Sequence, residues 1–483
     1  MRIQAIFRIL GMLLVIYSFF NLPPILVSVY YDTPDPYVFA ISFYATLIIG
    51  FLLWLPNKNI EYNLTHRDGF VVAVFLWLTL SAFSAIPFAL SKTLDLTLTE
   101  AFFEAVSGIT TTGATVIKNV DEVSKDLLYY RQQLQFLGGM GIIVLAVAIL
   151  PKLRIGGMQL FKTEITGLAK DDKITPRIAS TAKALWSVYF ILTLLCILAF
   201  YLAGMDLFDA VCYAFGTLST GGFAPHTASI AYYQSKTIYI INMIFMLLAA
   251  INFSLHFKAL KHKSLKYYFL DPECKYYFIY LFFVIAILFF SLIFYHTHTN
   301  SLDAFIDSAY HVISISTTTG LVKENFAMWP NFIPLFIIYI GIIGASAGST
   351  SGGIKFIRII MLHKQGMLEL KRLIHPHGKF VIKYGDNIVA NNTINSVWSF
   401  FAGYFAIYIC FLLILIALGL DFPTAFSAIA STLGNVGPGL GAVTEHYASI
   451  GSAAQFILSL SMLLGRLEIF TILVLFVPDF WKY

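Results

Sequence analysis

The segment Thr110-Thr111-Thr112-Gly113 is the first of four short loops in this chain that align with one another. The others read Ser219-Thr220-Gly221-Gly222, Thr317-Thr318-Thr319-Gly320 and Gly434-Asn435-Val436-Gly437. The likeness continues upstream, because a small residue stands six positions before the last glycine of every loop: Ser107, Gly216, Ser314 and Ser431. One such loop is common turn chemistry, whereas four in the same register indicate a fourfold internal repeat.

Glycine and threonine suit a loop whose carbonyl groups line an axis. Glycine adopts positive φ freely, so successive carbonyl oxygens can turn toward the axis without a Cβ clash. A ring of such carbonyls replaces the hydration shell of a cation inside a membrane. Taken alone, each loop could simply end a short helix. Together the four loops predict a cation filter, and we call Gly113, Gly222, Gly320 and Gly437 the filter glycines.

The composition is that of a membrane protein. Of the 483 residues, 58% are hydrophobic and 12% are charged, whereas about 25% are charged in soluble domains. Ten apolar stretches approach the length of about 20 residues that crosses a bilayer: 5–29, 37–55, 70–90, 135–150, 184–203, 238–257, 276–295, 332–345 with a continuation to 362, 397–418 and 457–477. Four segments at 98–109, 206–218, 302–316 and 422–433 precede the loops and are too short to cross.

The order of these segments predicts an all-α polytopic membrane protein. A leading two-helix hairpin (1–68) is followed by four units of helix, pore helix, filter loop and helix, arranged pseudo-fourfold around a pore. We expect these units at 69–160, 161–260, 261–385 and 386–483. Lys and Arg concentrate in the loops on one side, which by the positive-inside rule places both termini in the cytoplasm and the filter loops outside.

Residues 344–353, GASAGSTSGG, contain no bulky side chain. Such a stretch has poor helix propensity, and irregular backbone at membrane depth is tolerated where it lines a cavity or is buried in protein. We predict a gate beneath the filter, with close packing of small residues between helices as the alternative. The residues are Gly344, Ala345, Ser346, Ala347, Gly348, Ser349, Thr350, Ser351, Gly352 and Gly353.

Arg466 lies inside the apolar stretch 457–477. A charge at that depth costs about 3 kcal/mol or more, so the side chain should face the bundle interior or water. One interpretation is a structural ion pair with Glu468 or another acid. The other is a positive charge that lines the pore below the filter and repels cations.

Other polar residues have simpler interpretations. Glu100, Asp209 and Asp307 stand near the start of the predicted pore helices, where acidic side chains suit the helix N-terminus. The isolated histidines His226, His256 and His311 are expected to be packing or interfacial residues.

The four filter repeats resemble the superfamily of Trk, Ktr and HKT potassium transporters. The segments GGMGIIVL (138–145), AGSTSGGIK (347–355) and GNVGPGLG (434–441) resemble its TrkH/TrkG potassium-uptake branch. The resemblance implies K⁺ uptake across the bacterial inner membrane through a channel-like filter, with no cofactor bound by the chain. It also implies a homodimer and a cytoplasmic nucleotide-binding regulatory subunit, TrkA.

The same resemblance implies the potassium ligands, which are the two residues before each filter glycine. They are Thr111 and Thr112, Thr220 and Gly221, Thr318 and Thr319, and Asn435 and Val436. Sodium-preferring plant relatives carry a serine where this chain has Gly113, so the glycine favours potassium. The family's matching loop and arginine also support a gating role for residues 344–353 and for Arg466.

Two transport classes remain open at this point. A symporter that couples K⁺ to H⁺ or Na⁺ would carry intramembrane carboxylates and inverted halves. This chain has parallel repeats and almost no carboxylate in its spans besides Glu468, which favours the channel-like class. The sequence shows no nucleophile–base set, P-loop or dinucleotide fingerprint, so we expect no enzyme. Basic residues lie in loops between spans, so we expect the bilayer and no nucleic acid as a partner.

Overall fold

The computed structural model describes residues 3–59, 66–144, 177–298, 300–385 and 387–482, and these ranges are predominantly helical. The described sheet is one antiparallel hairpin of β1 (Lys383–Tyr384) and β2 (Asn387–Ile388). The leading hairpin consists of α1 (Ile3–Ser18), η1 (Phe19–Asn21) and α2 (Leu22–Tyr31), followed by α3 (Pro36–Trp54). A Cβ atom on Gly11 would overlap backbone atoms of Gly50 and Trp54, so α1 and α3 pack through a close glycine contact.

The rest of the chain repeats one pattern, in which a long helix, a short pore helix, a loop and a second helix follow one another. The first repeat has α4 (His66–Leu90), α5 (Leu98–Ile109) and α6 (Lys125–Val144); the second has α9 (Arg177–Leu202), α10 (Leu207–Leu218), α11 (Lys236–Ala250) and α12 (Phe253–His262); the third has α14 (Pro272–Phe294), α15 (Ser301–Ser316), α16 (Ile333–Ile342) and α17 (Phe356–Ile374); the fourth has α18 (Asn391–Ala417), α19 (Phe422–Gly434), α20 (Ser452–Arg466) and α21 (Phe470–Leu473). Short helices α13 (Lys266–Leu270) and α22 (Pro478–Trp481) complete the described set. This order confirms the predicted all-α fold class.

The expectation of a continuous span is wrong for the second helices of the second and fourth repeats, whereas the interruption of the third at residues 344–353 agrees with the poor helix propensity of that stretch. Among the described residues, six helices are long and apolar enough to cross a membrane, or up to eight if each of two bent pairs is one span. The α11–α12 pair bends by 97°, and α20 bends by 102° against the segment from Phe470 to Phe476. In the third repeat α16 ends at Ile342 and residues 344–353 are not helical.

Each break has a local cause. The side chain of Asn252 accepts a hydrogen bond from the amide of Ser254 and caps α12, which starts a new helix there. In the fourth repeat Glu468 and Ile469 both have φ of 55°, a strained conformation for a β-branched residue that ends the helix. The C-terminal part of the predicted stretch 135–150 and the boundary at 160/161 lie outside the described residues.

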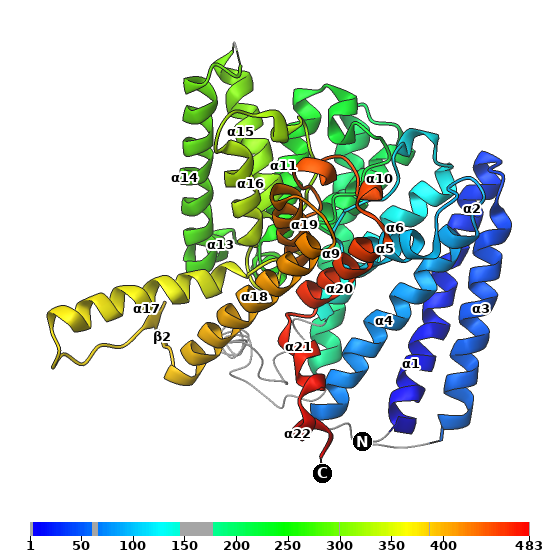
Figure 1. The fold of residues 1–483 in the computed structure, drawn as a ribbon, viewed down its shortest axis with the longest axis horizontal. Helices are drawn as coiled ribbons and strands as arrows, with labels where there is room; N and C mark the ends of the chain where they lie inside the picture. Colours follow the sequence, from blue (N-terminus) through cyan, green and yellow to red (C-terminus); the bar gives the residue numbers. More distant parts are fainter. Residues whose placement is uncertain (1–2, 60–65, 145–176, 299, 386, 483) are drawn as a thin grey trace.

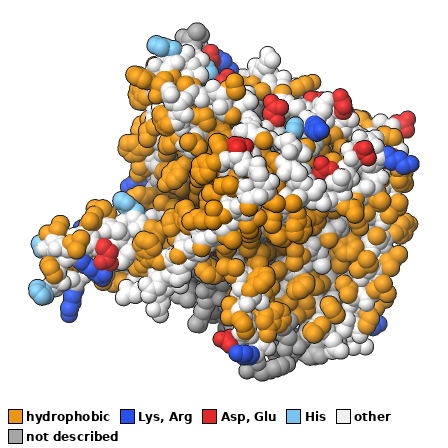
Figure 2. Space-filling view, viewed as in Figure 1, with side chains coloured by type: hydrophobic (Ala, Val, Ile, Leu, Met, Phe, Trp, Pro, Cys, Tyr) orange, Lys and Arg blue, Asp and Glu red, His pale blue; other side chains and the backbone are white. Residues whose placement is uncertain are grey.

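The surface matches a protein embedded in a bilayer. Figure 2 shows hydrophobic side chains over the broad middle of the molecule, with charged side chains at the upper and lower edges and on the projecting arm. That arm is α17 with the β hairpin, which extends away from the body (Figure 1). Both chain termini lie at the same lower end, opposite the upper edge (Figure 1).

Candidate functional site: a ring of four filter loops

The pore helices α5, α10, α15 and α19 each begin with a side-chain cap. The capping residues are Thr97, Asp206, Asn300 and Asp421, and each accepts a hydrogen bond from a backbone amide of the first turn. Glu100 closes a capping box with Thr97, as expected of an acid at this end. Asp209 lies in the first turn of α10, at the position that Glu100 has in α5, and Asp307 lies in the second turn of α15. Neither carboxylate caps its helix, because Asp209 binds His226 and Asp307 binds Lys323, which corrects the capping prediction for these two residues.

The four pore helices also end alike, in a backbone motif of two hydrogen bonds. The amide before each filter glycine donates to the carbonyl five residues earlier: Thr112 to Ser107, Gly221 to Gly216, Thr319 to Ser314 and Val436 to Ser431, at 2.8–2.9 Å. The preceding amide bonds three residues back, from Thr111, Thr220, Thr318 and Asn435. This is a Schellman ending, which requires one left-handed residue.

The left-handed residue is not a glycine in any of the four loops. Thr111, Thr220, Thr318 and Asn435 have φ of 54°, 53°, 59° and 53°. A threonine in this region costs about 1–3 kcal/mol and persists only where its surroundings impose it. The filter glycines themselves have φ between 76° and 102°. Each loop therefore repeats the same left-handed alternation, which turns carbonyl groups to one side.

The small residue six positions before each glycine has a steric reason. A Cβ atom on Gly216 would lie 2.8 Å from the carbonyl oxygen of Phe223, the residue after the filter glycine. In the third repeat Ser314 donates its hydroxyl to the carbonyl of Leu321 at 2.6 Å. The end of the pore helix and the exit of its loop thus pass too closely for a large side chain.

The four loops close into a cycle. A Cβ atom built on a filter glycine would overlap the carbonyl oxygen before the glycine of the next loop: Gly113 against Gly221, Gly222 against Thr319, Gly320 against Val436, and Gly437 against Thr112. Because the fourth loop contacts the first, the four loops surround a single axis in the order in which they occur along the chain. The ring places eight predicted ligand residues and four filter glycines at one site.

One vestibule of about 630 Å³ opens above this ring and is lined by all four filter glycines. Its wall carries charges of both signs, including Asp121, Lys323 and Glu324. His226 also lines it and bridges Asp209 through Nε2 (2.7 Å) and Asp121 through Nδ1 (3.1 Å). Burial alone lowers the pKa of His226, but hydrogen bonds and charge from the two carboxylates raise it above its ordinary value.

His226 is therefore not the isolated packing residue that we expected. The other two histidines do pack as predicted. His256 contacts the carbonyl of Leu248 at 2.8 Å, and His311 contacts the carbonyls of Asp307 and Glu324.

Two amide side chains hold the ring through four hydrogen bonds that the sequence does not reveal. Gln135 on α6 donates from Nε2 to the carbonyl of Gly221 at 2.6 Å and accepts from the amide of Phe223. Its amide group fills the space that a side chain at Gly221 would need. Asn435 donates from Nδ2 to the Thr112 hydroxyl and to the carbonyl of Met462, both at 3.0 Å. The second and fourth loops, which depart from Thr-Thr-Gly, are thus braced by amide side chains.

A buried ion pair supports the first pore helix. Arg131 Nε lies 2.8 Å from Glu104 Oε1, and both side chains are almost fully buried. Glu104 also accepts from the Thr115 hydroxyl and the amide of Val116. Since Thr115 follows the first filter loop, this pair ties the exit of that loop to α5 and α6. In the sequence, the only indication of this ion pair is Glu104, an acidic residue in the middle of the apolar segment 98–109.

Residues 344–353, which we call the intramembrane loop, lie directly beneath the ring. The amide of Gly352 donates to the Thr318 hydroxyl at 2.7 Å, and the Thr350 hydroxyl donates to the carbonyl of Leu218 at 3.0 Å. A Cβ atom on Gly352 would lie 2.8 Å from the Cβ of Asn435. The intramembrane loop thus contacts the end of the second pore helix and the third and fourth filter loops.

The ends of the broken helices bind this loop. The amide of Phe253, at the α11–α12 break, donates to the carbonyl of Gly348 at 3.0 Å, and the amide of Ser346 donates to Ala250. Glu273 at the start of α14 accepts from the amides of Ala347 and Ile357. Backbone groups freed by the helix breaks are paired here, as membrane depth demands.

Arg466 connects the loop to the first repeat. Its guanidinium donates to the carbonyl of Thr350 at 3.0 Å and to the carbonyl of Gly138 at 3.1 Å. The side chain is 2% exposed, at the last turn of α20. Glu468 pairs instead with Arg358 at 2.5 Å. Backbone carbonyls therefore hold Arg466, and Glu468, the acid considered from the sequence, does not.

Comparisons with known proteins agree with this architecture. The family model TrkH, described as a cation transport protein, matches residues 36–483. The chain is 45% identical to the Trk system potassium uptake protein TrkH of Vibrio parahaemolyticus and 44% identical to that of Escherichia coli, with all of each chain covered. It is 38% identical to the Trk system potassium uptake protein TrkG of Escherichia coli, covering all of this chain and 99% of the relative. These relatives are named as transport proteins and not as enzymes.

The structure superimposes on a crystal structure of the potassium transporter TrkH from Vibrio parahaemolyticus. The TM-score is 0.93 at 43% sequence identity, and the whole of each chain is covered. At this identity the likeness extends to the arrangement of helices and loops around the axis.

Proposed function

The chain belongs to the TrkH family of cation transport proteins, and from this premise we propose that it takes up potassium through a channel-like pore whose filter is the ring of four loops. The closed cycle of contacts between filter glycines and neighbouring carbonyls is the observation that carries this proposal. Fixed carbonyls around one axis exchange the hydration shell of a cation for backbone oxygens at little cost. The full-length relatives named as potassium uptake proteins support K⁺ as the transported ion.

We assign the ion ligands to the two residues before each filter glycine. Thr111 Oγ1 and Asn435 Oδ1 are buried without a hydrogen-bond partner among the described residues. Buried polar oxygens without partners are costly, and a bound ion is one of the explanations for them. A dehydrated cation on the axis would supply the missing interaction.

The gate, in this proposal, is the intramembrane loop together with Arg466. The loop closes the path because its backbone contacts the ring from below, and Arg466 fastens it to α6. Opening requires the bonds from Gly352 to Thr318 and from Arg466 to Thr350 to break.

The remaining assignments concern the surroundings of the pore. We propose a multi-pass protein of the bacterial inner membrane with both termini in the cytoplasm, divided into 1–68, 69–160, 161–260, 261–385 and 386–483. A homodimer would cover the exposed apolar side chains of α17, among them Met367, Leu370 and Leu373. Gating by a cytoplasmic nucleotide-binding subunit of the TrkA type belongs to the same proposal.

Flux through purified protein in liposomes tests the function. Rubidium or potassium uptake should follow the ion gradient and the membrane potential, and it should not require an imposed pH or sodium gradient. Sodium should permeate less than potassium. Uptake that occurs only when an inward proton or sodium gradient is imposed would establish the symport class and overturn the channel-like proposal.

A further inference from the structure

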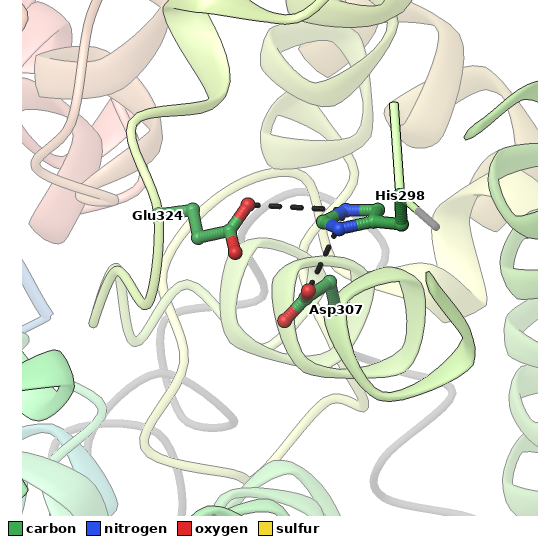
Figure 3. Close-up of side chains that lie close together, drawn as sticks. All are labelled: His298, Asp307 and Glu324. Atoms are coloured by element: carbon green, nitrogen blue, oxygen red, sulfur yellow. Dashed lines mark ion pairs between the residues drawn. The ribbon is translucent and has the colours of Figure 1, made fainter. Parts of the chain in front are cut away.

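A cluster beside the third filter loop combines one imidazole with two carboxylates. His298 lies in the connection between α14 and α15, Asp307 lies on α15, and Glu324 lies four residues after Gly320. His298 Nε2 is 3.5 Å from Asp307 Oδ2 and 3.9 Å from Glu324 Oε2. Figure 3 shows the three side chains converging from these different segments.

The donor set and its spacing suit a divalent transition metal ion. The three ligand atoms lie within 4.8 Å of one another. Zinc binds imidazole nitrogen and carboxylate oxygen at about 2.0–2.2 Å, so a tetrahedral ion holds its ligand atoms about 3.3 Å apart. Small side-chain rotations would bring the present separations to that value. Glu324 is 39% exposed on its side chain, which leaves water access for a fourth ligand.

The burial of the cluster points to a ligand independently. The side chain of Asp307 is 1% exposed, yet its Oδ2 has no hydrogen-bond partner among the described residues, and neither has His298 Nε2. A buried carboxylate oxygen without a hydrogen bond is expensive. The other oxygen of Asp307 binds the ammonium of Lys323, which also lies 3.9 Å from Glu324. Lys323 thus partly neutralises the two carboxylates, and a divalent metal ion would neutralise them more fully.

We propose that His298, Asp307 and Glu324 bind a zinc-like divalent metal ion, and that Lys323 competes with this ion for Asp307. Lys323 and Glu324 both line the vestibule above the filter. A bound metal ion adds positive charge there and turns the lysine away from Asp307. If the chain conducts K⁺ as proposed above, the metal should slow cation entry through electrostatic repulsion.

Metal binding by the full-length, tag-free protein in detergent tests the site directly. Zinc titration by calorimetry should show one strong site, and Co²⁺ should give the intense absorption of a tetrahedral complex. His298→Ala and Glu324→Gln should each weaken binding about tenfold or more, whereas Lys323→Met should strengthen it. Melting temperatures report whether each variant is folded.

His226→Ala is the matched control. His226 also lies between two carboxylates, but Asp121 and Asp209 contact opposite ring nitrogens, so one ion cannot bind all three. This variant should keep the zinc affinity and the Co²⁺ spectrum of the native protein. Native affinity and spectrum in folded His298→Ala and Glu324→Gln would overturn the site.

Flux measurements test the consequence. Zinc on both sides of the liposomes should inhibit native K⁺ flux, and His298→Ala should remove the inhibition while its flux without zinc stays unchanged. Zinc that binds the cluster without slowing the flux would overturn the effect on entry. Because the binding measurements need no transport, failure of the metal site and failure of the proposed function are distinguishable.

Discussion

Replacing Arg466 by alanine removes the connection between the intramembrane loop and the first repeat. Of the two hydrogen bonds lost, the one to the Thr350 carbonyl holds the loop and the one to Gly138 holds α6. A hydrogen bond to a charged group contributes about 1.5–3 kcal/mol. About 1.4 kcal/mol corresponds to a tenfold change in an equilibrium constant. Loss of the bond to Thr350 should therefore raise the open-to-closed ratio of the loop about 10- to 100-fold.

The stability of this variant should fall only modestly. An ion pair with Glu468 would have made the substitution severe, because an unpaired buried carboxylate costs about 3–5 kcal/mol. Glu468 keeps its partner Arg358 in the variant, and water entering from the pore can hydrate the two carbonyls. Yield, melting temperature and K⁺ flux should therefore be measured on the same preparation.

Two further variants separate the charge of Arg466 from its hydrogen bonds. Arg466→Lys keeps the positive charge but loses the forked donor geometry, whereas Arg466→Gln keeps a donor and loses the charge. Fast flux through Arg466→Lys would indicate that the tether closes the path, and fast flux through Arg466→Gln alone would indicate an electrostatic barrier. Native flux in a folded Arg466→Ala would exclude a closing role for this side chain, and a collapse of yield and melting temperature would show that its role is structural.

The other predictions concern the ring and its supports. Gly113→Ser puts a Cβ atom against the carbonyl of the next loop, at a position with left-handed backbone, and this conformation costs about 1–2 kcal/mol for a residue with a side chain. Reversal potentials in mixed K⁺ and Na⁺ should therefore show a lower preference for K⁺. Unchanged reversal potentials would exclude this loop from the filter. Deleting several residues within 345–353 should raise flux, and a folded deletion with native or lower flux would favour simple packing. Arg131→Met leaves Glu104 buried without its partner and should destabilise by about 3–5 kcal/mol in thermal unfolding, with partial recovery when Glu104→Gln is added. The pKa of His226 is raised in the folded protein. Its contribution to stability is therefore complete below the ordinary histidine pKa and is lost as the pH rises through the raised pKa. In His226→Asn the melting temperature should depend less on pH within this window.

Several features of this protein follow from local rules that can be applied to its sequence. The low charge content fixed a membrane environment, since too few charges exist to cover a soluble surface. The register of the four loops was readable because each left-handed turn and each close passage of backbone constrains a residue type nearby. The glycine at Gly113 and the small residue at Ser107 are examples, and the same spacing recurs in every repeat.

The bends of the second helices in the second and fourth repeats, and the partners of Arg466, arise only from contacts between distant segments. An apolar segment in lipid is equally compatible with a straight or a bent helix, because both can satisfy the backbone if partners are present. The partners here are backbone groups of the intramembrane loop and of Gly138, which lies 328 residues from Arg466. Every residue has the same backbone carbonyl acceptor, so no pattern of side chains in the sequence predicts such a hydrogen bond. Packing alone determines three other features: the cyclic order of the loops, the hydrogen bond from Gln135 to Gly221, and the ion pair between Glu468 and Arg358.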